Sequence, residues 1–178
     1  MRVREYLDVI IDKHPYAESL NKKLLKDAEN LRFYSKEENT NYTNLYGYKC
    51  SIKDDELTSN MRLIVDWVES LLVNKWPKFR EGAELHNAKP HTNIWFAKYN
   101  KGDYAIRHDH KVFALYAFVY FLKSPKGSSP LVFTTTGKRI KAEDGKVLIF
   151  PSTLFHHVPI NKCDDRMVIA GNIGLVKE

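Results

Sequence analysis

The sequence predicts an α+β fold in which helices come first and a β-rich core follows. In the first third of the chain, apolar residues recur at helical spacing. After Pro77 they form short β-branched and aromatic runs between turn residues, a pattern typical of a sandwich or barrel. A chain of 178 residues suits one domain. We therefore expect a single domain over 1–178, with residues 1–90 as mainly helical support and residues 91–178 as the β core.

Three segments of the N-terminal part are predicted to be helical. Apolar side chains follow helical spacing in each, and Pro15 separates the first two. The predicted helices are Glu5–Lys13, Ala17–Leu31 and Glu56–Trp76. Asp54 or Asp55 is expected to cap the last of them. The polar, turn-rich stretch Asn39–Gly47 is expected to be a loop.

Short runs in the C-terminal part are predicted strands. Turn sequences such as Asn100–Asp103 separate several of them. The predicted strands are Ile94–Tyr99, Tyr104–Arg107, Leu115–Leu122, Pro130–Thr135, Gly145–Phe150 and Arg166–Asn172. Because the helices precede these strands, we expect the helices to buttress one sheet.

Composition narrows the class of protein. Hydrophobic content of 43% and charged content of 28% are ordinary for a soluble globular protein. No apolar run approaches the roughly 20 residues that span a bilayer, and Met1–Tyr6 is too charged for a signal peptide. We expect a cytoplasmic protein without a membrane partner.

The net charge of +6 comes from scattered basic residues, which favours a solvated surface over a nucleic-acid partner. Cys50 and Cys163 are too few for a disulfide framework and are expected to stay reduced.

Histidines gather in two clusters, each following a predicted strand. The clusters are Arg107–His110 and Phe155–His157. Strand ends of a barrel can present side chains into its mouth, and imidazoles that converge there suit a first-row metal such as Fe(II). Arg166, soon after the second cluster, can hold a carboxylate bidentately. The pattern favours a metal-dependent oxygenase that uses an organic-acid cosubstrate.

These pieces, in this order, resemble the iron(II)/2-oxoglutarate-dependent dioxygenases, in particular the prolyl-hydroxylase-like branch and small phage or bacterial oxygenases. The matching segments are Tyr99–Tyr104, Phe118–Leu122, Gly145–Pro151 and His156–Val158. The resemblance implies a double-stranded β-helix (jelly-roll) catalytic core in 91–178 and, for a phage protein, a place in the host cytosol. It also implies a hydroxylase of a peptidyl or small-molecule substrate that consumes 2-oxoglutarate and O2. A peptidyl proline is the first substrate that it suggests.

By this resemblance, His108 and His156 bind Fe(II) and Arg166 binds the distal carboxylate of 2-oxoglutarate. Tyr120 and Tyr99 are expected to contact the same cosubstrate.

The third metal ligand stays open between His110 and Asp109. The family's carboxylate ligand stands two positions after the first histidine, where this chain has His110. Residues i and i+2 of an extended strand point to the same side, which favours His108 and His110 together. The usual set of two histidines and one carboxylate favours Asp109 instead.

Two other functions compete with the dioxygenase. One is a cupin-like enzyme with three histidine ligands that does not use 2-oxoglutarate; it would have no need of Arg166 or Tyr120. The other is a non-catalytic basic binding domain, which would need aromatic residues interleaved with arginine on its surface.

Overall fold

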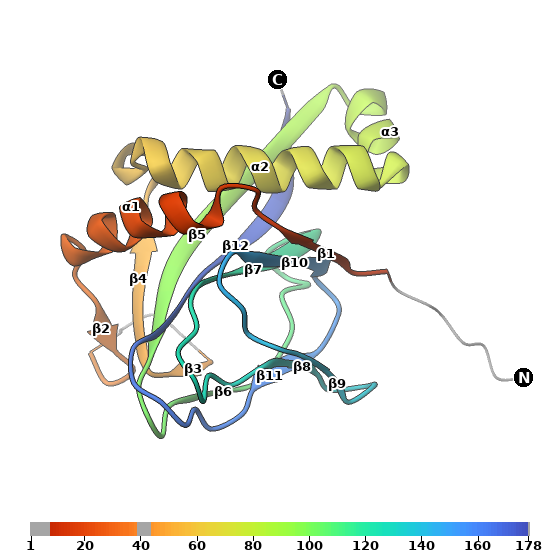
Figure 1. Ribbon diagram of the computed structural model, residues 1–178. Helices are drawn as coiled ribbons and strands as arrows, with labels where there is room; N and C mark the ends of the chain where they lie inside the picture. Colours follow the sequence, from red (N-terminus) through yellow and green to blue (C-terminus); the bar gives the residue numbers. More distant parts are fainter. Residues whose placement is uncertain (1–7, 39–43, 178) are drawn as a thin grey trace, which may run out of the picture.

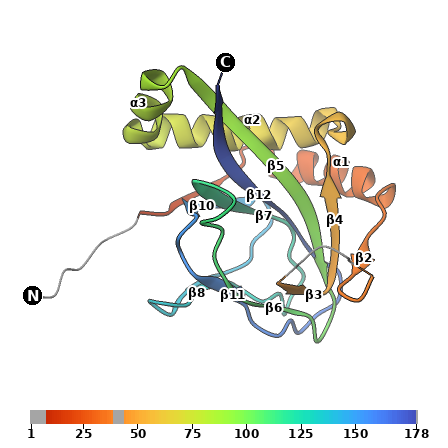
Figure 2. The same ribbon diagram turned by 180° about the vertical axis from the view of Figure 1, so that it is seen from behind.

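A computed structural model describes residues 8–38 and 44–177 of the chain. Two antiparallel sheets, of seven and five strands, make up its core. Helices lie across the outer face of the seven-stranded sheet, and the five-stranded sheet lies on the opposite side (Figures 1 and 2). This arrangement confirms the predicted α+β class.

The helices and strands have the following bounds. The helices are α1 (Ala17–Glu29), α2 (Ser59–Lys75) and α3 (Pro77–Leu85), with a 3-10 turn η1 (Asp54–Glu56). The strands of the larger sheet, in spatial order, are β1 (Ile10–Lys13), β10 (Lys146–Pro151), β7 (Tyr116–Lys123), β12 (Arg166–Lys177), β5 (Ala88–Tyr99), β4 (Tyr48–Ile52) and β2 (Tyr34–Ser35). Those of the smaller sheet are β3 (Leu45–Tyr46), β6 (Tyr104–His108), β11 (His156–Val158), β8 (Leu131–Phe133) and β9 (Lys138–Ile140).

The helix predictions hold for α1 and α2, with one correction at a cap. Thr58, not Asp54 or Asp55, caps α2, because its hydroxyl accepts the Met61 N–H at 3.2 Å. The two aspartates lie in η1 instead. Helix α3 was not predicted, although Pro77 occupies its first turn, where proline is favoured.

Strand pairing overrides two other predictions. The expected helix over Glu5–Lys13 is wrong from Ile10 on, because β1 pairs with β10 and sets Ile10 opposite Ile149; residues 5–7 lie outside the described part. The expected loop over Asn39–Gly47 contains β3, which pairs with β6; residues 39–43 lie outside the described part. Strands β1 to β4 therefore extend both sheets from the N-terminal part, and the single-domain division at residue 90 stays a prediction.

Side chains on the larger sheet alternate between two apolar layers. On β7, Phe118 and Tyr120 pack toward the helices, while Val119 and Phe121 face the smaller sheet. The same alternation runs along β10, β12 and β5. The second layer leaves room for a cavity between the sheets. No helix within the described ranges is both long and apolar enough to cross a membrane.

Candidate metal and cosubstrate site

A cavity of about 720 Å³ lies between the two sheets and contains both histidine clusters. Its apolar wall comes mainly from the inner face of the larger sheet, including Val119, Val168 and Ala170. Its polar groups come from the ends of β6, β11 and β12 and from the loop after β6. A mostly apolar cavity with a few convergent polar groups is the usual form of a small-molecule site.

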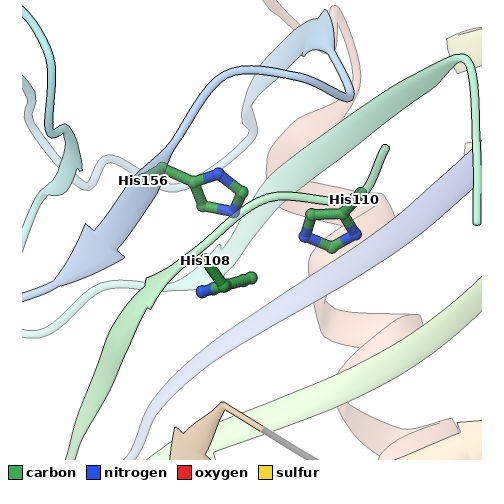
Figure 3. Close-up of side chains that lie close together, drawn as sticks. All are labelled: His108, His110 and His156. Carbon is green, nitrogen blue, oxygen red and sulfur yellow. The ribbon is translucent and has the colours of Figure 1, made fainter. Parts of the chain in front are cut away.

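Three imidazoles meet in this cavity. His108 ends β6 and His156 begins β11, and strand pairing sets them directly opposite each other. Their ring centroids are 4.3 Å apart, and each lies 5.1 Å from the ring centroid of His110. The potential ligand atoms of all three lie within 4.8 Å of one another (Figure 3).

Each of the three rings has one nitrogen engaged with an oxygen acceptor. Nδ1 of His108 lies 2.7 Å from the backbone carbonyl two residues earlier, and Nδ1 of His156 lies 2.8 Å from the equivalent carbonyl. Nδ1 of His110 lies 2.6 Å from Oδ1 of Asn172. An oxygen acceptor fixes the proton on Nδ1 and leaves the Nε2 lone pair for a metal. The three rings are therefore held in the tautomer that a metal site needs.

Burial keeps these histidines neutral. Burial, aided by the neighbouring imidazole of His108, lowers the pKa of His156 to about 3 and that of His110 to about 4. Burial also lowers the pKa of His108. At neutral pH all three rings therefore offer an uncharged lone pair.

The chain bends after β6, and this bend places His110. The strand ends at His108, and the His110 N–H then donates to the Ser152 carbonyl at 2.8 Å. The carboxylate of Asp109 pairs with Lys111 at 3.5 Å instead of joining the three rings. His110 thus lies with His108, although a loop rather than strand alternation puts it there. Which residues bind metal stays a prediction.

Arg166 lies at another part of the same cavity and is buried, with 1% of its surface exposed. Its Nε donates to the Ser129 carbonyl at 3.1 Å, and its guanidinium carbon lies 4.3 Å from the centroid of the Tyr99 ring. Nη1 has no hydrogen-bond partner among the described residues. A buried guanidinium with an unused donor is suited to an acceptor group on a ligand.

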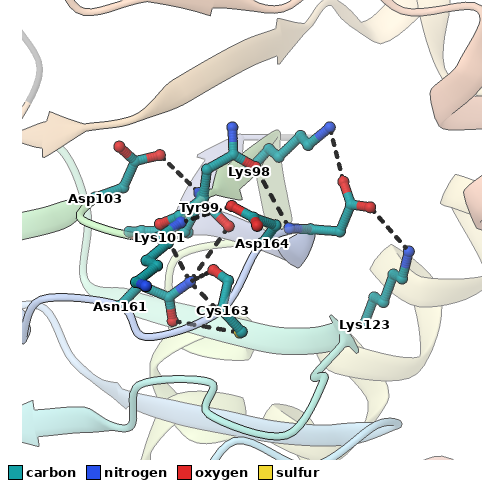
Figure 4. Close-up of polar contacts among 10 residues, drawn as sticks. Lys98, Tyr99, Lys101, Asp103, Lys123, Asn161, Cys163 and Asp164 are labelled. Carbon is teal, nitrogen blue, oxygen red and sulfur yellow. Dashed lines mark hydrogen bonds and ion pairs between the residues drawn. The ribbon is translucent and has the colours of Figure 1, made fainter.

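A network of polar contacts joins Tyr99, at the end of β5, to Asn161 and Cys163 in the loop before β12 (Figure 4). The amide of Asn161, which is 1% exposed, donates to the Cys163 carbonyl at 2.7 Å and to the Tyr99 carbonyl at 3.3 Å. Its Oδ1 accepts the Ser129 N–H at 3.0 Å. Ser129, whose carbonyl accepts from the Arg166 guanidinium, and Tyr99, at the end of β5, are therefore both hydrogen-bonded to Asn161.

Tyr120 does not reach the cavity, which corrects its expected contact with a cosubstrate. Its side chain points to the helix side of β7, and its hydroxyl donates to Asn21 of α1 at 2.5 Å. His157 also points elsewhere, with Nδ1 3.2 Å from the Thr134 hydroxyl.

Three residues of the cavity were not predicted from the sequence to belong to the site. Asn172 orients His110, and Trp95 stacks against the same ring with centroids 6.0 Å apart. Lys49 of β4 also lines the cavity. A polar residue inside the apolar run Val168–Ile173 was a usable signal for Asn172. Lys49 gave none, because β4 was not recognised as a strand.

Comparison with solved structures places the fold. The chain is similar to a viral collagen prolyl hydroxylase from Paramecium bursaria Chlorella virus-1, solved as a 2OG complex, with a TM-score of 0.66 and 16% identity over 95% of this chain and 96% of that one. It is similar to a Pseudomonas putida prolyl-4-hydroxylase with a TM-score of 0.65 and 16% identity over 97% and 94%. It is also similar to a Trichoplax adhaerens prolyl hydroxylase, solved with a hypoxia inducible factor peptide fragment. The TM-score is 0.66, and the identity is 17% over 92% of this chain and 82% of that one.

These likenesses confirm the predicted jelly-roll fold. No protein-family model matches the chain, and no curated protein matches it either. The fold is thus shared with 2-oxoglutarate-dependent oxygenases. Because one fold can host many functions, the function depends on the residues of the cavity.

Proposed function

We propose that this protein is an Fe(II)- and 2-oxoglutarate-dependent dioxygenase. The observation that carries the proposal is one cavity holding three imidazoles with free Nε2 atoms and a buried guanidinium with an unused donor. The first group suits a first-row metal, and the second suits the carboxylate of an organic acid.

The residues present fit a metal ion. His108, His110 and His156 would hold it through Nε2, because Nδ1 of each ring is already engaged. Neutral imidazole suits iron among other first-row metals. This donor set lacks the usual carboxylate, so the ion would keep its full double positive charge.

The residues present also fit 2-oxoglutarate. Arg166 would pair with the carboxylate far from the metal, with Ser129 fixing the guanidinium and the Tyr99 ring lying beneath it. The apolar wall of the cavity limits access of water to this ion pair, which strengthens the pair. Lys162 is exposed and does not line the cavity, so it offers no alternative clamp.

Bound Fe(II) with 2-oxoglutarate and O2 supplies oxidative decarboxylation to succinate and CO2, coupled to oxidation of a primary substrate. The protein's own groups bind and orient: the histidines fix the metal, and Arg166 fixes the direction of the cosubstrate. Solved structures of the same fold include one in complex with a peptide fragment and one with nickel, 2-oxoglutarate and hygromycin B bound, which supports a peptidyl or small-molecule primary substrate.

A metalloenzyme that does not use 2-oxoglutarate is the second candidate. The absence of a carboxylate from the three-residue cluster favours it. The unused donor of Arg166 favours the dioxygenase, because such an enzyme needs no carboxylate clamp.

Anaerobic calorimetry separates the two candidates. The dioxygenase proposal predicts one Fe(II) per chain, and 2-oxoglutarate binding that requires the metal. Succinate should then form when air is admitted, even without a primary substrate, although slowly. Metal binding without 2-oxoglutarate binding would transfer the assignment to the second candidate.

A further inference from the structure

We propose that Lys49 binds an anionic group, a carboxylate or a phosphate, of the primary substrate. This inference deepens the proposed function by naming the class of substrate. It rests on the proposed function only in identifying the bound anion as part of the primary substrate. The anion subsite itself depends on groups present in the protein without metal or cosubstrate.

Lys49 reaches into the cavity from the edge of the larger sheet. It lies on β4 directly opposite Ala97 of β5, whose side chain faces the cavity, and residues paired in this way share a face. The Lys49 ammonium lies 4.7 Å from the centroid of the Trp95 ring, which in turn stacks on His110. Lys49 and the three histidines line the same cavity. Lys49 is thus a neighbour of the three imidazoles.

Lys49 has no anionic partner among the described residues. The Trp95 ring is the contact that stabilises its charge, and no ion pair there includes Lys49; the nearby Asp109 pairs with Lys111. Burial lowers the pKa of Lys49, which is the cost of holding an ammonium away from water. A substrate anion would offset that cost.

The charge balance of the cavity points to the same substrate class. Its lining has four basic side chains, Lys49, Arg107, Lys111 and Arg166, and one carboxylate, Asp109. A divalent metal and the 2-oxoglutarate dianion cancel each other, so the positive excess of the lining is left for the primary substrate. These cations surround a cavity, which suits a group that enters it.

The aromatic surroundings define the rest of the substrate. Trp95 lies beside Lys49, and Phe113 and Phe155 also line the cavity. Phe113 is 76% exposed, while the Arg107 guanidinium lies 3.7 Å from the centroid of the Phe155 ring. Cations beside aromatic faces suit an anionic group attached to an apolar or aromatic body.

The test uses benzoate and phenyl phosphate as anionic probes and benzamide as a neutral one. Each is titrated into the full chain by NMR, both without metal and with Ni(II) and 2-oxoglutarate bound. The protein is compared with Lys49→Gln, which removes the charge, and with Lys49→Arg, which retains it. Lys89→Gln is the matched control, because Lys89 is an exposed residue of β5 outside the cavity.

We expect Lys49→Gln to weaken binding of at least one anionic probe by about 10- to 150-fold, the worth of a charge-assisted pair. Lys49→Arg and Lys89→Gln should bind like the unaltered protein, and benzamide should not distinguish the variants. The tighter anionic probe assigns the source as carboxylate or phosphate. Equal binding of the anions to unaltered and Lys49→Gln protein overturns the proposal. Loss of anion binding in Arg166→Met but not in Lys49→Gln also overturns it, because Arg166 would then be the anion site.

The outcome is independent of the dioxygenase assignment. A Lys49-dependent anion site in metal-free protein stands even if no succinate forms. Succinate formation without such a site would leave the dioxygenase in place and remove the substrate class.

Discussion

Replacement of Arg166 by methionine should weaken 2-oxoglutarate binding without unfolding the protein. The side chain is 1% exposed, and its Nη1 has no partner among the described residues. Burial lowers the pKa of Arg166, because its charged form loses hydration there. A methionine of similar length would remove this cost, and such replacements of buried charges are often neutral or stabilising.

The expected loss in binding follows from the contacts of the guanidinium. A charge-assisted pair with a carboxylate is worth about 1.5–3 kcal/mol, so the 2-oxoglutarate dissociation constant should rise by about 10- to 150-fold. Metal affinity should stay unchanged, because Arg166 belongs to a different part of the cavity from the three histidines. Anaerobic calorimetry measures both constants, and thermal unfolding measures stability. The matched control is Lys162→Met, which changes an exposed lysine close to Arg166 in sequence.

Two results would refute this reasoning. If Arg166→Met bound 2-oxoglutarate as tightly as the unaltered protein, the carboxylate clamp would lie elsewhere. If Arg166→Met unfolded at a much lower temperature while Lys162→Met did not, the guanidinium would serve the corner around Ser129 and Asn161 rather than a ligand.

Three further predictions concern the histidines and Tyr120. His110→Ala should remove most of the metal affinity while Asp109→Ala leaves it nearly intact, as measured by calorimetry with Ni(II). Tyr120→Phe should lower the free energy of unfolding by about 1–3 kcal/mol, because it leaves the buried Asn21 oxygen without its donor, yet 2-oxoglutarate binding should not change. Burial lowers the pKa of His110 to about 4 and that of His156 to about 3, so below pH 6.5 the unfolded chain binds more protons than the folded one. In metal-free protein the free energy of unfolding, followed by urea titration, should therefore fall as pH falls from 6.5 to 4, by about 1.4 kcal/mol per pH unit for each histidine.

Each of these has a contrary outcome. Loss of metal in Asp109→Ala and its retention in His110→Ala would restore the set of two histidines and one carboxylate. Weaker 2-oxoglutarate binding in Tyr120→Phe would mean that the tyrosine acts on the cavity through its sheet. A free energy of unfolding that stays constant between pH 6.5 and 4 would mean that these histidines are not held neutral.

The convergence of His108 and His156 was predictable because each follows a predicted strand. The pairing that sets them opposite each other was not, because β11 is a three-residue strand that the sequence analysis did not predict. Strand alternation favoured His110 over Asp109 beside His108, and the His110 ring does lie beside His108 and His156, but for a different reason. Strand alternation does not extend past His108; the hydrogen bond from His110 to the distant Ser152 sets its direction.

Long-range pairing explains what the sequence could not predict. The apolar pattern around Ile10 and Ile11 is compatible with a helix as well as with a strand. The pairing of β1 with β10 makes this segment a strand. Tyr120 was predicted to face the cavity but faces the helices. A strand that is apolar on both faces gives no sign in the sequence of which face meets the helices. Lys49 was not predicted as a site residue because its strand, β4, is defined by its long-range pairing with β5.

Release of labelled CO2 from carboxyl-labelled 2-oxoglutarate tests the central claim most directly. The assay compares unaltered protein with His156→Ala and Arg166→Met, each with and without Fe(II) and O2. The dioxygenase proposal predicts release from the unaltered protein that requires both Fe(II) and O2, none from His156→Ala, and restoration in Arg166→Met toward the unaltered rate only at 2-oxoglutarate concentrations raised about 10- to 150-fold. Absence of release from protein that binds Fe(II) and 2-oxoglutarate, or release unaffected by His156→Ala, would contradict it.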